Sequence, residues 1–428
     1  MYTYIATNRA WLESKGEHTL VELYGAVFGL NSGDMLSTND FYQYITYYRQ
    51  NLEDTDKYFL TICLLLLTSE LHLSICPPYA QESSFRYTPV RRCAFRSVIG
   101  LFFEYIDAAF LCNCAERQVA DFIAERSLQA HLPDPITQEV ASLGPAEHHL
   151  QSTAPVEILK FIGFFGKILS LVTSNPCITH TALKYEYKSL CKLSALSATV
   201  VISGWSSEND DLNEEWKGLK PSGAAYGLVW EAGTLFSSAV KAIEAGVTAA
   251  VPGLAVKAGV VAVVSAGLAG AGSCLYDFVT GCQKAAFTGK ELARHLQEHV
   301  FGFVPISLIG FSMGCRVIYY CLKELSKALP QCYIQDVILL GGAVKNDPML
   351  WDRLLKCVAG RAVNVYSNQD GMLKKLYIIP MILKPPPIGI GPVLCMRMEN
   401  FDASEYITGH QDHRKHLTET LARIGYIS

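Results

Sequence analysis

The chain has little charge. Only 18% of its 428 residues are Asp, Glu, Lys or Arg, against about 25% in an average soluble domain. Acidic and basic residues nearly cancel, leaving a net charge of −4, so the composition gives no reason to expect nucleic acid as a partner. Half of the residues are apolar and the mean hydropathy is +0.19. This predicts one large or two medium domains with a large core, and apolar surface left to meet lipid or a protein partner.

Paired cysteines and a secretory leader are also missing. The 14 cysteines are scattered; Cys112-x-Cys114 is the only close pair, and no C-x-x-C pair occurs. Residues 1–5 lack the charged and apolar segments of a signal peptide. We therefore expect a cytoplasmic protein with reduced, mostly buried thiols, and neither a metal nor a cofactor.

Long runs without charge are scarce. Two apolar stretches, residues 58–73 and 161–172, are short or interrupted by charge. The exception, Ala258–Tyr276, carries no charge and repeats small residues every four positions. It belongs to an Ala-, Gly- and Val-rich insert at about 232–276. Strands expected on either side of the insert would share one sheet, so the insert must leave and return on the same side. We predict a helical lid or a shallow membrane-docking hairpin; the alternatives are a full span and a helix pair that enlarges the core.

The most informative stretch that is present is residues 304–318. Val304–Ile309 is an apolar run typical of a buried parallel strand, and from Cys315 onward apolar residues recur at helical spacing. Between them lies Gly310-x-Ser312-x-Gly314, the nucleophile elbow of serine hydrolases in its strand–turn–helix context. The following helix N-terminus would supply N–H groups for an oxyanion. The alternative is an ordinary turn in which Ser312 caps the helix.

An activated serine needs a histidine base, and that base needs a carboxylate. In α/β-hydrolases the chain order is Ser, acid, His. Asp370 follows the predicted strand 361–367, the second strand after Ser312, and is our first choice for the acid. Asp347 follows the intervening strand and is the runner-up, and Asp402 is a later possibility.

Three histidines near the C-terminus are candidates for the base. His410 lies between a predicted last strand, 393–398, and a predicted final helix, 417–424, and is our first choice. His413 is the runner-up. The spacing of His410, His413 and His416 also suggests a metal, but steps of three residues on a helix do not bring all three together.

The second oxyanion donor is expected upstream. The β-branched run Thr199–Ile202 predicts a buried strand that ends in Ser203-Gly204-Trp205. A hydrolase of this architecture places an N–H group there. Our candidates are the backbone amides of Trp205 and Met313. The alternative for this segment is a simple strand-ending turn.

Strands and helices alternate from residue 195 onward, which predicts an α/β fold with a mostly parallel, doubly wound sheet. Residues 1–150 predict a helical region, including helices at 95–114 and 114–132. We therefore divide the chain into an N-terminal helical region, 1–150, and an α/β domain, 151–428.

The motifs and their order resemble the DUF726 family of α/β-hydrolase-like proteins, the group of the transmembrane and coiled-coil domain-containing proteins. The resemblance runs from about residue 195 to the C-terminus. It rests on segments 201–205, 229–231, 308–322, 339–342, 364–370 and 409–410. It implies an α/β-hydrolase fold, triad positions at Ser312, Asp370 and His410, and membrane association. The chain departs from the family pattern in a short, charged stretch at 161–172, and in His413, where a tyrosine usually follows the Gly-His pair.

Two functions follow as hypotheses. The first is a lipase- or esterase-like serine hydrolase, associated with the cytoplasmic face of a membrane, that cleaves a lipid or other apolar acyl ester. The second is a catalytically silent adaptor in membrane traffic, in which the helical region 1–150 binds a protein partner.

Overall fold

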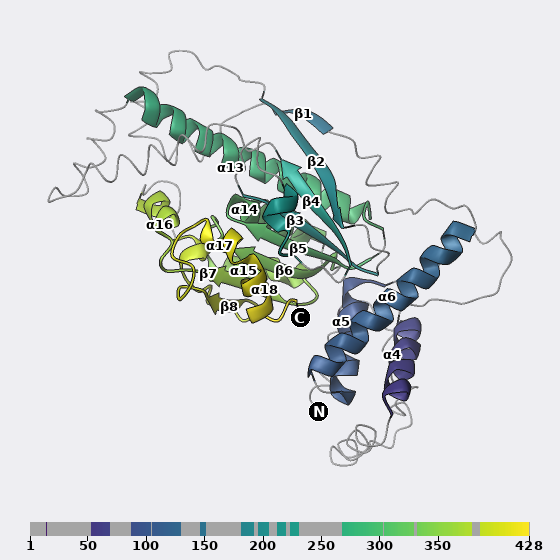
Figure 1. Ribbon diagram of the computed structural model, residues 1–428. Coiled ribbons are helices and arrows are strands. Elements are labelled where there is room, and N and C mark those ends of the chain that lie inside the picture. Colours follow the sequence, from purple (N-terminus) through teal and green to yellow (C-terminus); the bar gives the residue numbers. More distant parts are fainter. Residues whose placement is uncertain are drawn as a thin grey trace.

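The computed structural model describes residue 14 and residues 53–68, 87–103, 105–129, 146–150, 181–191, 196–204, 212–219, 223–230, 268–302, 304–328, 332–378 and 386–427. These residues form an eight-stranded sheet with helices on both faces, and a separate group of helices beside it (Figure 1).

The sheet has the strand order β1-β2-β4-β3-β5-β6-β7-β8. The strands are β1 Ala146–Leu150, β2 Thr181–Cys191, β3 Ala198–Ile202, β4 Ala224–Trp230, β5 Ile306–Phe311, β6 Ile334–Leu340, β7 Ala362–Tyr366 and β8 Glu399–Asp402. All neighbours from β4 to β8 are parallel, while β2 runs antiparallel to both β1 and β4. Every residue of β3 and β5 is buried, as expected for central strands covered on both faces. The predicted α/β fold with a mostly parallel sheet is confirmed.

Successive residues of a strand point to opposite faces of the sheet. Both faces of the central strands are apolar, so both must be covered by helices. Val200, Ile202 and Leu308 share one core with three helices. These are α13 (Leu268–Gln297), α14 (Met313–Leu325) and α15 (Pro348–Leu354). Val201 and Ile309 face the other core, which is completed by α10 (Leu212–Trp216) and α18 (Leu417–Arg423). The remaining elements of this part are α16 (Gly371–Ile378), α17 (Asp412–Lys415) and the 3₁₀ turns 326–328, 355–357 and 388–390.

The separate group consists of α4 (Asp54–Thr68), α5 (Pro89–Phe102) and α6 (Tyr105–Gln129), seen in purple and blue in Figure 1. It has its own apolar core. It meets the sheet where strands begin: Leu196, just before β3, belongs to that core, and the Gln335 amide of β6 donates to Cys93 Sγ of α5 (3.0 Å). The helical group therefore lies at the edge of the sheet opposite the carboxyl ends of the parallel strands.

Several predicted boundaries are wrong. α5 ends at Phe102 and α6 continues from Tyr105 through residue 114, so the predicted break between two helices at residue 114 is wrong. The predicted last strand, 393–398, is a loop, and β8 begins only at Glu399. β1 lies at the end of the region predicted to be helical.

Most of the predicted insert, residues 232–267, lies outside the described residues, and its last part forms the beginning of α13. In the part of the chain that is described, no helix combines the length and the apolar character required to cross a membrane.

Candidate functional site

Ser312 joins β5 to α14 in a strained turn. Its backbone has φ 54° and ψ −115°, a conformation that non-glycine residues adopt rarely and at a cost of about 1–3 kcal/mol. Two hydrogen bonds hold it there: the Ser312 amide donates to the Leu340 carbonyl (2.9 Å), and its own carbonyl accepts from the Ala343 amide (3.1 Å). The side chain makes no capping hydrogen bond to α14. The hydroxyl is therefore not used as an ordinary helix cap.

The flanking glycines are required by close packing. A Cβ on Gly314 would lie 2.1 Å from the Ile202 carbonyl oxygen, and one on Gly310 would lie 2.9 Å from the Cys315 amide nitrogen. Both obstacles are backbone atoms, which cannot rotate away. The elbow thus sits directly on the end of β3, where the strand order reverses and open α/β sheets bind their ligands.

A chain of hydrogen bonds runs from Ser312 through His410 to Asp370. His410 Nε2 lies 2.7 Å from Ser312 Oγ, and His410 Nδ1 lies 2.6 Å from Asp370 Oδ2. The other carboxylate oxygen, Oδ1, accepts from the Leu373 amide at the start of α16 (3.0 Å). The structure thus brings together three side chains that follow β5, β7 and β8.

The electrostatics of Asp370 fix the roles of the two imidazole nitrogens. Burial by itself would raise the pKa of Asp370, but hydrogen bonds from His410 and from the Leu373 amide lower it below its usual value. An ionised carboxylate only accepts hydrogen bonds, so His410 Nδ1 carries the proton. Nε2 is then an acceptor aimed at the Ser312 hydroxyl, the arrangement that activates a nucleophile.

Phe311 supports the imidazole. Its ring stacks on His410 with centroids 4.9 Å apart and 30° between the planes. Because Phe311 is the last residue of β5, the strand that carries Ser312 also supports the ring of His410. Phe311 was not among the predicted site residues, although it is the variable position next to the serine in the elbow motif.

The runners-up are engaged elsewhere. Asp347 Oδ1 accepts from the Leu350 amide (3.1 Å) and so caps α15, and its other oxygen faces Lys345. Asp402 accepts from the Ser404 amide (2.9 Å). His413 is buried against Gly341, and its ring nitrogens have no hydrogen-bond partner. Burial and neighbouring His410 lower the pKa of His413 to about 4.

The three histidines do not converge. His416 Nδ1 pairs with Glu419 (2.9 Å), whereas His410 bonds Ser312 and Asp370. Within the ranges that the structure describes, no three His, Cys, Asp or Glu side chains gather as a metal site would require.

One of the two predicted oxyanion donors can be located. Met313 is the first residue of α14, and the first amides of a helix have no acceptor inside it. Trp205 lies outside the described residues. The residue before it, Gly204, passes so close to the elbow that a Cβ there would lie 2.8 Å from Ser312 Cβ.

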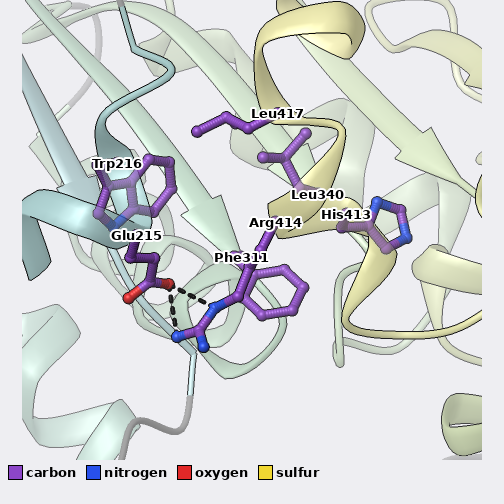
Figure 2. Close-up of a pocket in the computed structure, with 7 residues that line it drawn as sticks. All are labelled: Glu215, Trp216, Phe311, Leu340, His413, Arg414 and Leu417. Carbon is purple, nitrogen blue, oxygen red and sulfur yellow. Dashed lines mark hydrogen bonds and ion pairs between the residues drawn. The ribbon is translucent and has the colours of Figure 1, made fainter. Parts of the chain in front are cut away.

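A charged pair beside the elbow was not predicted. Figure 2 shows Glu215 of α10 and Arg414 of α17 joined across a small cavity of about 10 Å³, also lined by Trp216, Phe311, Leu340, His413 and Leu417. Arg414 Nε donates to Glu215 Oε1 (2.8 Å), and Nη2 lies 2.7 Å from the same oxygen. The two residues are 199 positions apart in the sequence, so no local pattern indicates that they pair.

The comparisons with known proteins agree with the sequence motifs. Residues 135–427 match the family described as "Protein of unknown function (DUF726)". The chain belongs to this family. Its match to DUF726 starts upstream of β1 and includes every strand of the sheet.

Relatives of this DUF726 chain occur in animals, plants and fungi. It is 31% identical over 259 residues to an uncharacterized membrane protein of Caenorhabditis elegans (56% of this chain, 42% of the relative). It is 30% identical over 241 residues to the transmembrane and coiled-coil domain-containing protein STS1 of Oryza sativa subsp. japonica (54% and 36%). It is 29% identical over 255 residues to the probable lipase MIL1 of Saccharomyces cerevisiae (56% and 24%). The matched stretch thus spans less than half the length of these three relatives.

Proposed function

We propose that this chain is a serine hydrolase with an α/β-hydrolase fold that cleaves an acyl ester. The observation that carries the proposal is the unbroken chain of hydrogen bonds from Ser312 through His410 to Asp370, on a serine held at φ 54°. The order Ser, Asp, His along the chain, after β5, β7 and β8, is the order of α/β-hydrolases. The resemblance of the sequence to that fold supports the same assignment.

The proposed mechanism is nucleophilic acyl transfer. Ser312 Oγ attacks the acyl carbonyl while His410 Nε2 takes the hydroxyl proton, and Asp370 stabilises the imidazolium that forms. The proton passes from His410 to the leaving alcohol, and water then hydrolyses the acyl-enzyme by the same route. The amide of Met313, at the N-terminus of α14, is one proposed oxyanion donor, and the amide of Trp205 is the other.

The proposed substrate is a lipid or another apolar acyl ester at the cytoplasmic face of a membrane. Three observations support a lipid substrate at a membrane: the apolar composition, the yeast relative named as a probable lipase, and the relatives named as membrane proteins. We further propose that residues 151–428 act as the catalytic domain, to whose sheet β1 (Ala146–Leu150) adds an edge strand, and that the helices within 1–150 are available to a protein partner.

The test is covalent labelling with a fluorophosphonate probe, which reacts with activated serines. The native full-length chain is expected to label, and Ser312→Ala is expected to lose all labelling. Asp370→Asn retains the shape of the side chain but loses the charge that sets the tautomer of His410, so its labelling rate should fall about 10⁴-fold. Asp347→Asn is the matched control and should label at the native rate.

Failure of the folded native chain to label, with and without liposomes, would contradict the hydrolase and favour the adaptor. The substrate class needs a separate measurement, the hydrolysis of p-nitrophenyl esters of increasing chain length in the presence of liposomes. Turnover restricted to short, water-soluble esters would contradict the lipid substrate while leaving the hydrolase intact.

A further inference from the structure

We propose that Glu215 and Arg414 are positioning residues that hold the segment after β3 against Ser312. This inference rests on the proposed function, because that segment leads into Trp205, the proposed second oxyanion donor. Glu215 acts through Ser203, and Arg414 acts through Glu215 and the ring of Phe311.

Ser203, the first residue after β3, is fixed from three directions. Its hydroxyl donates to Glu215 Oε2 (2.6 Å) and accepts from Trp216 Nε1 (2.9 Å). Its carbonyl accepts from Trp230 Nε1 (3.1 Å). The donor and one acceptor site of a serine hydroxyl are thereby occupied, so the direction of the chain at Ser203 is fixed. Gly204, which follows, lies against Ser312.

Glu215 connects Ser203 to the segment that carries His410. Its second oxygen, Oε1, accepts from Arg414, which lies four residues after His410. The Arg414 guanidinium also lies 5.3 Å from the centre of the Phe311 ring, and that ring stacks on His410. One carboxylate therefore joins the end of β3 to the histidine segment. Figure 2 shows its pairing with Arg414.

The burial of this pair indicates positioning rather than stability. The Glu215 side chain is only 5% exposed and that of Arg414 21%. A buried ion pair generally adds little net stability over apolar residues of the same size, because both charges lose their hydration. What it does supply is a fixed distance between two segments. A shift of about 1 Å in a catalytic group lowers rates about 100-fold.

The experiment measures the rate constant and the final extent of fluorophosphonate labelling in full-length variants. Glu215→Gln retains size but cannot accept from both Arg414 and Ser203 as a carboxylate does. Ser203→Ala removes only the hydroxyl that bonds Glu215 and Trp216. It is the second variant, which tests the proposal if Glu215→Gln folds poorly. The matched control is Glu399→Gln. Glu399 accepts from Arg361 Nε (2.9 Å) and Nη2 (2.7 Å). This pair lies where β7 and β8 begin, whereas Ser312 follows the end of β5.

We expect the labelling rate constant to fall at least about 10-fold in Glu215→Gln and Ser203→Ala, with the final extent unchanged, and to stay native in Glu399→Gln. With a p-nitrophenyl ester, kcat should fall while KM stays the same, since oxyanion contacts form only in the transition state. A native rate constant in both site variants, or a loss confined to the final extent, would overturn the positioning role alone. Failure of the folded native chain to label would overturn this role together with the proposed function.

Discussion

Ser312 occupies a backbone conformation that few non-glycine residues adopt. Its neighbours determine that conformation. The amide of Ser312 bonds to Leu340, the last residue of β6, its carbonyl bonds to Ala343 just after β6, and Gly204 and Gly314 leave room for the turn. Strain of this kind persists only where the surroundings over-determine it, and it concentrates at functional sites. The fold therefore gives up stability at Ser312 to point its hydroxyl at His410.

Removing the Cβ of Ser312 should recover that stability. Ser312→Gly and Ser312→Ala both lose the hydroxyl and its bond to His410, and only the glycine relaxes the backbone at φ 54°. We expect Ser312→Gly to be more stable to urea than Ser312→Ala by about 1–2 kcal/mol, with neither variant labelled by fluorophosphonate. Equal unfolding midpoints would show that the turn is not strained.

His413 makes stability depend on pH. Its pKa is lowered from 6.5 to about 4 in the folded chain, so the unfolded chain binds the proton more tightly. The neutral ring contributes its full stability above about pH 6.5, and that contribution is lost as the pH falls toward 4. A shift of this size is worth at most about 3 kcal/mol.

Replacing His413 by leucine should remove this part of the acid sensitivity. His413→Leu loses no hydrogen bond, because the ring nitrogens have no partner. Urea unfolding at pH 7.5 and pH 4.5 would compare the two chains, and carboxylates common to both cancel in the difference. We expect the native chain to lose up to about 3 kcal/mol more than the variant between these pH values. An equal loss would place the ring in contact with solvent.

The elbow between β5 and α14 depends on the end of β3. In Gly314→Ala the new methyl group would meet the Ile202 carbonyl at 2.1 Å, so α14 must move away from β3. Such overpacking costs about 1–3 kcal/mol or more, and the movement should also slow the labelling of Ser312. The matched control is Gly371→Ala at the start of α16, where a Cβ meets nothing within 4 Å. Urea unfolding should show the control to be neutral or slightly stabilised, and similar losses in both variants would contradict the packing argument.

The central strands could be predicted because buried parallel strands are continuous apolar runs. The juxtaposition of Ser312, Asp370 and His410 could be predicted because parallel strands bring their carboxyl ends to one edge. The strand β8 could not be predicted, because its sequence Glu-Asn-Phe-Asp is mostly exposed. An edge strand pairs through its backbone on one side and needs no apolar pattern. The apolar run before it is a loop, in which Leu394 is 80% exposed and Met396 100%.

Contacts between distant segments could not be predicted. The bond of Glu215 to Arg414 and the stacking of Phe311 on His410 depend on how strands and helices are placed in space, and no spacing along the chain encodes them. The end of α5 could not be predicted either. Residues 103–104 include no glycine or proline that would mark the end of a helix, and Phe102 and Phe103 are both buried, so burial does not mark it.

At the scale of the whole molecule, the described residues form three apolar cores, two on the faces of the sheet and one among α4, α5 and α6. The core of α4, α5 and α6 contains a buried charged cluster in which Glu116 accepts from Arg92 (2.8 and 2.7 Å) and from Arg96 (2.8 Å). Burial alone would raise the pKa of Glu116, but the two guanidinium groups hold it well below its usual range. This cluster lies toward the starts of the strands, whereas Ser312 lies at their ends. The helical group and the site should therefore respond separately to substitution.

Glu116→Gln tests that separation. The substitution leaves the buried Arg92 guanidinium and the half-buried Arg96 guanidinium without their counter-charge, and breaking a buried pair costs about 3–5 kcal/mol. The loss should appear as lower urea resistance and faster amide hydrogen exchange in α4–α6. Because Cys93 meets Gln335 near the start of β6, and Leu196 of the helical core lies just before β3, the rate constant for labelling Ser312 in the folded chain should stay native. Glu399→Gln, which breaks a half-exposed pair, should cost no more than about 1 kcal/mol. A labelling rate that falls together with the exchange protection of α4–α6 would show instead that the helices support the site through the sheet.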